Sequence, residues 1–392
     1  MKRVALLGST GSIGRQSLEV MESLPDRFAV RGLAAGTSIE ELARQVVKHR
    51  PALVSTQTRA GAAELAERLR AARLDPLPEI VWGTEGIERV ATDPEADLLI
   101  SAAVGVVGLP ATYKAIEQGK TIALANKEVL VAAGEVVTKA ARRAGVPMLP
   151  IDSEHSAIHQ CLRAGQRKEL RRLVLTASGG PFRRTPIEDL DAVTPDQALA
   201  HPNWRMGRRI TVDSATLTNK GFEVIEARWL FDAAPDQIDV VIHPQSTIHS
   251  MVEFLDGSVV AQLGPPDMRI PIQYALTFPD RLPASGFSLD WTQMRLDFEP
   301  VPAEKFPCLG LARHALRAGG PLPCALNAAD EIAVAAFLDR RLPFPGIAQV
   351  IEQVLDRMPR MRFERIEDVL EADGEARRLA AEEVSRREAR VS

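Results

Sequence analysis

The chain has 392 residues, enough for two or three domains with their own apolar cores. Apolar residues make up 45% of it and charged residues 26%, a composition typical of soluble globular proteins. The 48 basic and 52 acidic side chains give a formal charge of −4, which argues against a nucleic-acid-binding or membrane-surface protein. Three widely spaced cysteines without a C-x-x-C pair favour reduced thiols and a cytoplasmic protein.

A glycine-rich turn follows the first predicted strand. The apolar run Val4–Leu7 leads directly into Gly8-Ser9-Thr10-Gly11-Ser12-Ile13-Gly14, and a helical pattern begins after it. A strand, a glycine turn and a helix N-terminus in this order can bind a pyrophosphate, because open backbone N–H groups and the helix dipole attract it. The spacing is G-x-x-G-x-x-G, so an ordinary glycine turn stays open as an alternative to a nucleotide site.

The next predicted strand ends in small residues. Phe28–Ala35 is followed by Gly36-Thr37-Ser38, and no acidic residue stands at the strand tip. NAD-selective sites usually place an Asp or Glu there to bind the ribose 2′-hydroxyl. Small hydroxyl side chains leave room for a 2′-phosphate and can donate hydrogen bonds to it. The pattern therefore favours NADPH.

Residues 1–150 alternate strand-like and helical patterns, which predicts a parallel sheet covered on both faces and a Rossmann-like dinucleotide domain. The loops after the strands near residues 101 and 125 should lie at its ligand-binding edge. The predicted strands are Val4–Leu7, Val30–Ala34, Ala52–Ser55, Glu79–Val81, Leu98–Ala102, Thr121–Ala125 and Met148–Ile151.

The remainder of the chain predicts three further parts. Residues 151–280 suit an α+β catalytic and dimerisation domain, in which Asp256-Gly257 joins two strands as a hairpin. Residues 281–308 are rich in proline and predict an extended linker. Residues 309–392 show four helical stretches, typical of a small bundle. The fold class is thus α/β with an α+β domain and a C-terminal helical bundle.

Two carboxylates stand just after the last predicted strand of the first domain. In an extended backbone, Asp152 and Glu154 would point the same way and would repel unless a cation lay between them. Oxygen ligands of this kind suit Mg²⁺ or Mn²⁺. A solvated loop with helix-capping acids is the alternative for an isolated D-x-E.

The segment from Asp213 to Glu223 adds polar groups at the start of an apolar helix. Ser214, Asn219 and Lys220 are suitable donors for a phosphate monoester, although Asn219-Lys220 alone fits a polar helix entry equally well. Glu223 is a candidate third metal ligand, with Glu226 as its neighbour one turn on. Ser178-Gly179-Gly180 is a further candidate phosphate-binding turn.

The segment His201-Pro202-Asn203-Trp204-Arg205-Met206-Gly207 is bounded by proline and glycine. Such a loop fits a mobile substrate lid, while a buried Trp anchor is the structural alternative.

Taken together, these motifs resemble the 1-deoxy-D-xylulose 5-phosphate reductoisomerase family over nearly the whole chain. The resemblance implies NADPH-dependent conversion of that substrate to 2-C-methyl-D-erythritol 4-phosphate in non-mevalonate isoprenoid biosynthesis, with Mg²⁺, Mn²⁺ or Co²⁺ as the metal. It also implies a homodimer, with no nucleic-acid or membrane partner. The chain departs from the family at Thr37-Ser38, where many relatives have Lys-Asn.

The resemblance also assigns site residues. The metal ligands are Asp152, Glu154 and Glu223; the residues nearest the chemistry are Lys127, Glu154 and His201. The substrate-binding residues are Lys127, Ser153, Glu154, Ser178, His201, Trp204, Met206, Ser214, Asn219, Lys220 and Glu223. The cofactor-binding residues are Gly8, Thr10, Gly11, Ser12, Ile13, Gly36, Thr37, Ser38, Asn126, Glu128 and Gly207.

Two alternatives remain at this point. An NADP-dependent dehydrogenase of another phosphorylated sugar or semialdehyde would need no site with three carboxylates. An NADP(H)-sensing regulatory protein would be expected to carry a DNA-binding module or a basic patch, and the sequence has neither.

Overall fold

The computed structural model describes residues 1–204, 206–284 and 286–391. The chain forms two compact units. The first contains Met1–Val129, Val137–Ser156 and Met268–Pro283; the second contains Leu130–Val136, Ala157–Asp267 and the chain from Ala284 onward. The four-part division expected from the sequence stays a prediction.

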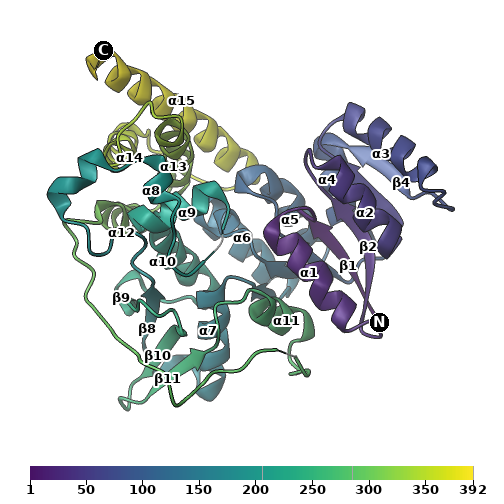
Figure 1. Ribbon diagram of the computed structural model, residues 1–392, viewed down its shortest axis with the longest axis horizontal. Coiled ribbons are helices and arrows are strands. Elements are labelled where there is room, and N and C mark those ends of the chain that lie inside the picture. The colour runs from purple at the N-terminus through teal and green to yellow at the C-terminus, as the bar shows by residue number, and fades with distance from the viewer. Residues whose placement is uncertain (205, 285, 392) are drawn as a thin grey trace. The chain divides into compact units, whose positions relative to one another are not determined.

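A parallel sheet of seven strands is the centre of the first unit (Figure 1), in the order β4-β3-β2-β1-β5-β6-β7. The inner strands are short apolar runs, as expected for a sheet buried on both faces, while the edge strand β4 is only partly covered. The strands are β1 (Lys2–Leu7), β2 (Phe28–Ala34), β3 (Leu53–Thr56), β4 (Glu79–Trp82), β5 (Leu98–Ser101), β6 (Thr121–Leu124) and β7 (Met148–Pro150).

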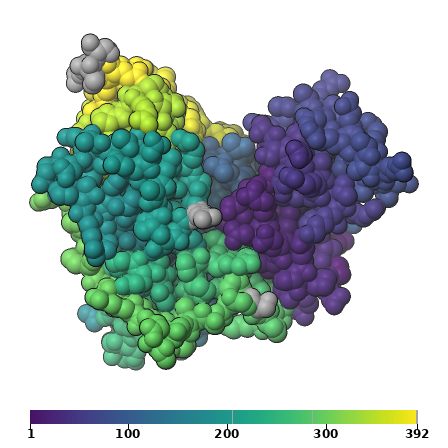
Figure 2. Space-filling view, viewed as in Figure 1, coloured from purple at the N-terminus to yellow at the C-terminus, as the bar shows by residue number. Residues whose placement is uncertain are grey.

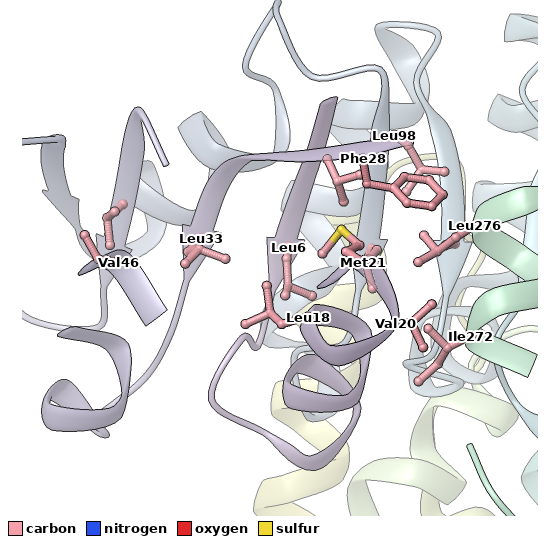
Figure 3. Close-up of a cluster of buried hydrophobic side chains, with 14 of the residues drawn as sticks. Leu6, Leu18, Val20, Met21, Phe28, Leu33, Val46, Leu98, Ile272 and Leu276 are labelled. Atoms are coloured by element: carbon pink, nitrogen blue, oxygen red, sulfur yellow. The ribbon is translucent and has the colours of Figure 1, made fainter. Parts of the chain in front are cut away.

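Helices cover both faces of this sheet. They are α1 (Ser12–Ser23), α2 (Ile39–His49), α3 (Arg59–Ala71), α4 (Gly83–Ala91), α5 (Leu109–Glu117) and α11 (Arg269–Thr277). Figure 3 shows Leu18 of α1 beside Leu6 and Ile272 of α11 beside Val20, in the apolar cluster on one face. On the opposite face Gly32 approaches Val90 of α4, where an added Cβ would lie 3.1 Å from the Val90 side chain. Strand side chains alternate between the two faces, so the same short runs supply both cores.

Two helices have residues in both units. They are α6 (Glu128–Ala144), whose backbone is non-helical at Ala133, and α7 (Ser153–Cys161). Within the second unit, α6 approaches α10 (Thr218–Phe231) at Gly134, where a Cβ would lie 2.1 Å from the Trp229 ring. Only glycine fits at that point of contact.

The second unit contains a mixed sheet in the order β11-β10-β8-β9. Its strands are β8 (Leu170–Ala177), β9 (Ile238–Ile242), β10 (Ile248–Phe254) and β11 (Val259–Leu263); β8 and β9 are parallel and the other pairs antiparallel. The short helix α8 (Pro195–Ala198) precedes α9 (Arg208–Thr216) and α10. Leu217 has a φ of 58° and separates α9 from α10.

Residues 286–306 of the proline-rich segment form no helix and cross the surface of the second unit (Figure 2), with one isolated bridge between Glu299 and Ile242. The C-terminal helices are α12 (Pro307–Ala318), α13 (Leu322–Leu338), α14 (Gly346–Arg357) and α15 (Ile366–Val391). Within the described ranges, no helix combines the length and the apolar character needed to cross a membrane.

The α/β class, the seven strands of the first sheet and the four C-terminal helices are confirmed, with differences of a few residues at their ends. One local prediction is wrong: residues 152–154 are not extended, because α7 begins at Ser153. The Asp152 carboxylate accepts from the backbone N–H of Glu154 at 3.2 Å and thereby caps the helix, the alternative role considered for this acid.

Candidate functional site

The glycine turn closes tightly between β1 and α1. Gly8 has a φ of +79°, and a Cβ there would lie 2.3 Å from the Ala102 carbonyl oxygen. A Cβ on Gly14 would lie 2.3 Å from the Gly8 carbonyl oxygen. Gly11 stands at the N-cap of α1 and supplies no side-chain cap. The first turn of α1 therefore presents backbone N–H groups at the edge of the sheet, as a bound pyrophosphate requires.

The predicted 2′-phosphate residues stand at the same edge of the sheet. Gly36, Thr37 and Ser38 are exposed between β2 and α2, and the backbone N–H groups of Gly8 and Ser9 donate to the Ala34 carbonyl at 2.9 and 3.0 Å. The glycine turn and the β2 tip are thus neighbours.

Asn126 shapes the loop after β5. Its side-chain amide donates to the Ala103 carbonyl and, at 2.8 Å, to the Gly105 carbonyl. Its buried Oδ1 has no hydrogen-bond partner among the described residues, so an acceptor is left at the cofactor edge. Glu128, also predicted to contact the cofactor, opens α6 two residues later.

The Asp152 carboxylate in the first unit is largely covered and lies beside a cation. Lys127 Nζ lies 2.6 Å from Asp152 Oδ2, and His155 Nδ1 lies 3.0 Å from Oδ1. Burial alone would raise the pKa of Asp152, but Lys127 and His155 together hold it well below its usual range. Ser153 Oγ donates to the Glu154 carboxylate. Two carboxyl groups and a lysine therefore meet at the end of β7.

A second carboxylate group lies in the first turns of α10. The Glu223 side chain is buried; it accepts from Asn219 Nδ2 at 2.6 Å and from Lys220 Nζ. Burying a carboxylate is costly unless a cation or donors compensate it, and here both do. Glu226, the expected neighbour of Glu223, is also buried.

A hydroxyl-lined turn in the second unit is the candidate phosphate site. Ser178 Oγ lies 3.0 Å from His201 Nε2 and accepts from the Gly180 N–H. Gly180 has a φ of +64°, and a Cβ there would lie 2.8 Å from the Ser214 carbonyl oxygen. The turn is therefore held against α9 beside Ser214. Burial lowers the pKa of His201, which favours the neutral ring as a hydrogen-bonding partner.

The predicted lid is attached to the mixed sheet. The His201 ring accepts from the Trp204 N–H at 3.0 Å, and Asn203 Nδ2 donates to the Pro244 carbonyl at 2.7 Å. The Trp204 ring is half-buried, 6.4 Å from the His249 ring. Met206 is also half-buried, Gly207 caps α9 without a side chain, and Arg205 lies outside the described residues.

The sequence reasoning missed two supporting residues. His155 pairs with Asp152, and its position three residues after an acid at a helix start was the available signal. Asn203 holds the lid through contacts with a loop some forty residues away, for which the sequence carries no local signal.

Known proteins match this chain over nearly its whole length. Three family models match the chain. The model described as "1-deoxy-D-xylulose 5-phosphate reductoisomerase" matches residues 4–134, and the model of that enzyme's C-terminal domain matches residues 148–231. A third, described as "DXP reductoisomerase C-terminal domain", matches residues 263–379. A 1-deoxy-D-xylulose 5-phosphate reductoisomerase of Solibacter usitatus is 51% identical over 97% of both chains. One from Pelotomaculum thermopropionicum is also 51% identical, with 97% of both chains covered.

Solved structures give the same result. A reductoisomerase crystallised with NADPH, fosmidomycin and magnesium superposes with a TM-score of 0.93 at 39% identity, covering 98% of both chains. The Zymomonas mobilis enzyme in complex with NADPH gives 0.91 at 42% identity, covering 98% of this chain and 99% of that one. This chain belongs to the 1-deoxy-D-xylulose 5-phosphate reductoisomerase family.

Proposed function

We propose that this chain converts 1-deoxy-D-xylulose 5-phosphate to 2-C-methyl-D-erythritol 4-phosphate, with NADPH as reductant and a divalent metal ion. The observation that carries the proposal is the near full-length family match, which includes the glycine turn and both lysine–carboxylate groups. A dehydrogenase of another substrate would not need those two groups.

Asp152, Glu154 and Glu223 are the proposed metal ligands. Their donor atoms are carboxylate oxygens, which suit Mg²⁺, Mn²⁺ or Co²⁺. In each unit a lysine ammonium group occupies a cation's place beside the acid, Lys127 at Asp152 and Lys220 at Glu223, and a bound metal ion would share or take that place. When bound, the ion would polarise the substrate's ketone and neighbouring hydroxyl oxygens.

The second unit supplies the proposed phosphate site. Ser178, Ser214 and Asn219 offer neutral donors, Lys220 offers a charge, and His201 lies within hydrogen-bonding distance of Ser178. Phosphate binding at a distance from the reacting carbons contributes binding energy that can close Trp204 and Met206 over the substrate.

Three groups in the first unit would handle the substrate's oxygens. Ser153 and Glu154 lie in the first turn of α7, and Lys127 stands at the N-cap of α6. Lys127 donates to a substrate oxygen, while Glu154 accepts a hydroxyl proton. Both side chains are held by hydrogen bonds before substrate arrives, which limits the reorganisation needed for reaction.

The proposed conversion rearranges the substrate's carbon skeleton to a branched aldehyde, and NADPH would supply the hydride that reduces this aldehyde to the product. The pyrophosphate of NADPH would bind the turn through Gly8, Thr10, Gly11, Ser12 and Ile13, and Asn126, Glu128 and Gly207 are further proposed cofactor contacts. The absence of an acid at Gly36-Thr37-Ser38 supports NADPH over NADH.

We also propose a homodimer in the cytoplasm, with no nucleic-acid partner. Strand β11 is an edge strand of the mixed sheet, Val259 on it is 54% exposed, and Leu255 beside the hairpin turn is 65% exposed. An open edge with apolar side chains is suited to pairing with a second copy. Light scattering of the full chain tests this assembly.

The activity is tested by NADPH oxidation with 1-deoxy-D-xylulose 5-phosphate in the presence of Mg²⁺, Mn²⁺ or a chelator. We expect turnover that requires both substrate and metal. Glu223→Gln should severely weaken the binding of the metal ion and lower kcat. NADPH binding at the glycine turn should be unchanged. Wild-type turnover with an unchanged Mg²⁺ requirement in that variant would contradict the ligand assignment.

A further inference from the structure

The β2 tip carries hydroxyl groups but no cation for a 2′-phosphate. Thr37 and Ser38 are exposed, and Ser38 stands at the N-cap of α2 without using its side chain as a cap. The next two residues of α2 after Ile39 are acidic, Glu40 and Glu41, and both pair with Arg44. Two acidic side chains and one arginine give this turn a negative net charge. That charge would repel a phosphate dianion unless another cation lay nearby.

The loop after the neighbouring strand lies beside this turn and carries an arginine, Arg59. Strands β2 and β3 are parallel with Ala34 opposite Ser55, so the loops after them leave the same edge of the sheet. The Gln57 N–H donates to the Gly36 carbonyl at 3.5 Å, and Gln57 Oε1 lies 3.8 Å from where a Gly36 Cβ would be. The Gln57 side chain therefore lies directly beside the β2 tip.

Arg59 begins α3 close to the start of α2. The two helix starts pack together through Gly61, where a Cβ would lie 3.0 Å from Ile39 Cδ1. The Arg59 side chain is exposed and, within the described part of the chain, forms no ion pair with a carboxylate. Its guanidinium lies over the Trp82 ring, 5.9 Å from the centroid.

That stacking is a weak restraint. Cation–π contacts at exposed sites are worth much less than a pair of charge-assisted hydrogen bonds to a phosphate, and an arginine can make both contacts with different parts of its planar group. Trp82 ends β4, on the other side of β3 from β2, so the Arg59 side chain would turn from this ring to reach a phosphate at the β2 tip; the contact leaves its hydrogen-bond donors unsatisfied.

We propose that the β3–α3 loop is part of the NADPH specificity site, with Arg59 as the cation for the 2′-phosphate and Gln57 as a neutral donor. The inference rests on the proposed use of NADPH and extends it to residues outside the glycine turn and the β2 tip. Arg59 is thereby a specificity-determining residue: it recognises the phosphate that distinguishes NADPH from NADH.

The experiment measures dissociation constants by calorimetry for the full-length wild type and the Arg59→Ala, Gln57→Ala and Arg70→Ala variants. The ligands are NADPH, NADH and the fragment pair 2′,5′-ADP and 5′-AMP. Arg70 is the matched control, an exposed arginine at the opposite end of the same helix.

We expect Arg59→Ala to weaken NADPH and 2′,5′-ADP about tenfold, the low end for a charge-assisted hydrogen bond at an exposed site. NADH and 5′-AMP should change less than about twofold, because they lack the phosphate. Gln57→Ala should cost about threefold for the same two phosphate-bearing ligands. Arg70→Ala should change nothing.

Unchanged NADPH affinity in Arg59→Ala would overturn the inference, and so would an equal loss for NADPH and NADH, which would make Arg59 a support of the loop. A thermal midpoint within about 2 °C of wild type shows that the variant is folded. Failure of the wild type to bind NADPH would instead overturn the proposed function, so the two failures are distinguishable.

Discussion

Gly14→Ala is the perturbation whose size follows most directly from the structure. The added Cβ would lie 2.3 Å from the Gly8 carbonyl oxygen and 2.5 Å from that of Ser9, where ordinary contact begins at 3.4 Å. Both obstacles are backbone atoms, so α1 must move by about 1 Å relative to the turn. Overpacking of this kind costs roughly 1–3 kcal/mol of folding stability.

The same movement should impair the cofactor site. A displacement of about 1 Å in groups that position a ligand can cost up to ~100-fold in function, so we expect the NADPH dissociation constant to rise at least about tenfold. Calorimetric titration with NADPH and a thermal melt of the same sample measure both effects.

Gly310→Ala is the matched control. Gly310 is an exposed residue inside α12 with no atom within 4 Å of an added Cβ. The substitution should stabilise the chain by roughly 0.5–1 kcal/mol and leave NADPH binding unchanged. If Gly14→Ala instead binds NADPH like the wild type and melts at the same temperature, the packing argument for the glycine turn is wrong.

Three further substitutions test the second unit. Trp204→Ala should raise KM with little change in thermal midpoint, because the ring is only half-buried beside His249; a loss of about 3–5 kcal/mol would instead mark a core anchor. Lys220→Ala should raise KM for the phosphorylated substrate far more than for an analogue without the phosphate, and equal losses would place Lys220 elsewhere. Burial, opposed by Arg209, raises the pKa of Asp330 to about 6, so the folded protein binds more protons than the unfolded chain between about pH 4 and 6. The wild type should therefore lose stability relative to Asp330→Asn as pH rises through that window in a series of thermal melts, and a constant difference would refute this.

The sequence predicts the first sheet well because its strands are short apolar runs separated by amphipathic helices. The expected Val4–Leu7 is observed as Lys2–Leu7, and Glu79–Val81 as Glu79–Trp82. Strand β9 was not predicted; its central residues are only half-buried, so its apolar pattern is short and follows directly on a turn.

Some features of the candidate site can also be predicted from the sequence, and others cannot. The residue types at Asp152, Glu154 and Glu223 indicate a metal site from the sequence, yet the local backbone was misjudged. Asp152-Ser153-Glu154 carries helix-start residues, and this local preference prevails over continuation of β7. The proposed role of Arg59 rests on strand register and on helix packing at Gly61, and neither can be read from residues near Arg59 in the sequence.

Product analysis tests the central claim most directly. The chain would be incubated with NADPH, Mg²⁺ and 1-deoxy-D-xylulose 5-phosphate labelled with ¹³C, and the product identified by NMR. The proposed function predicts the branched skeleton of 2-C-methyl-D-erythritol 4-phosphate, formed only when the metal is present. A linear polyol phosphate from direct reduction of the ketone, with or without metal, would contradict it and would identify a simple dehydrogenase.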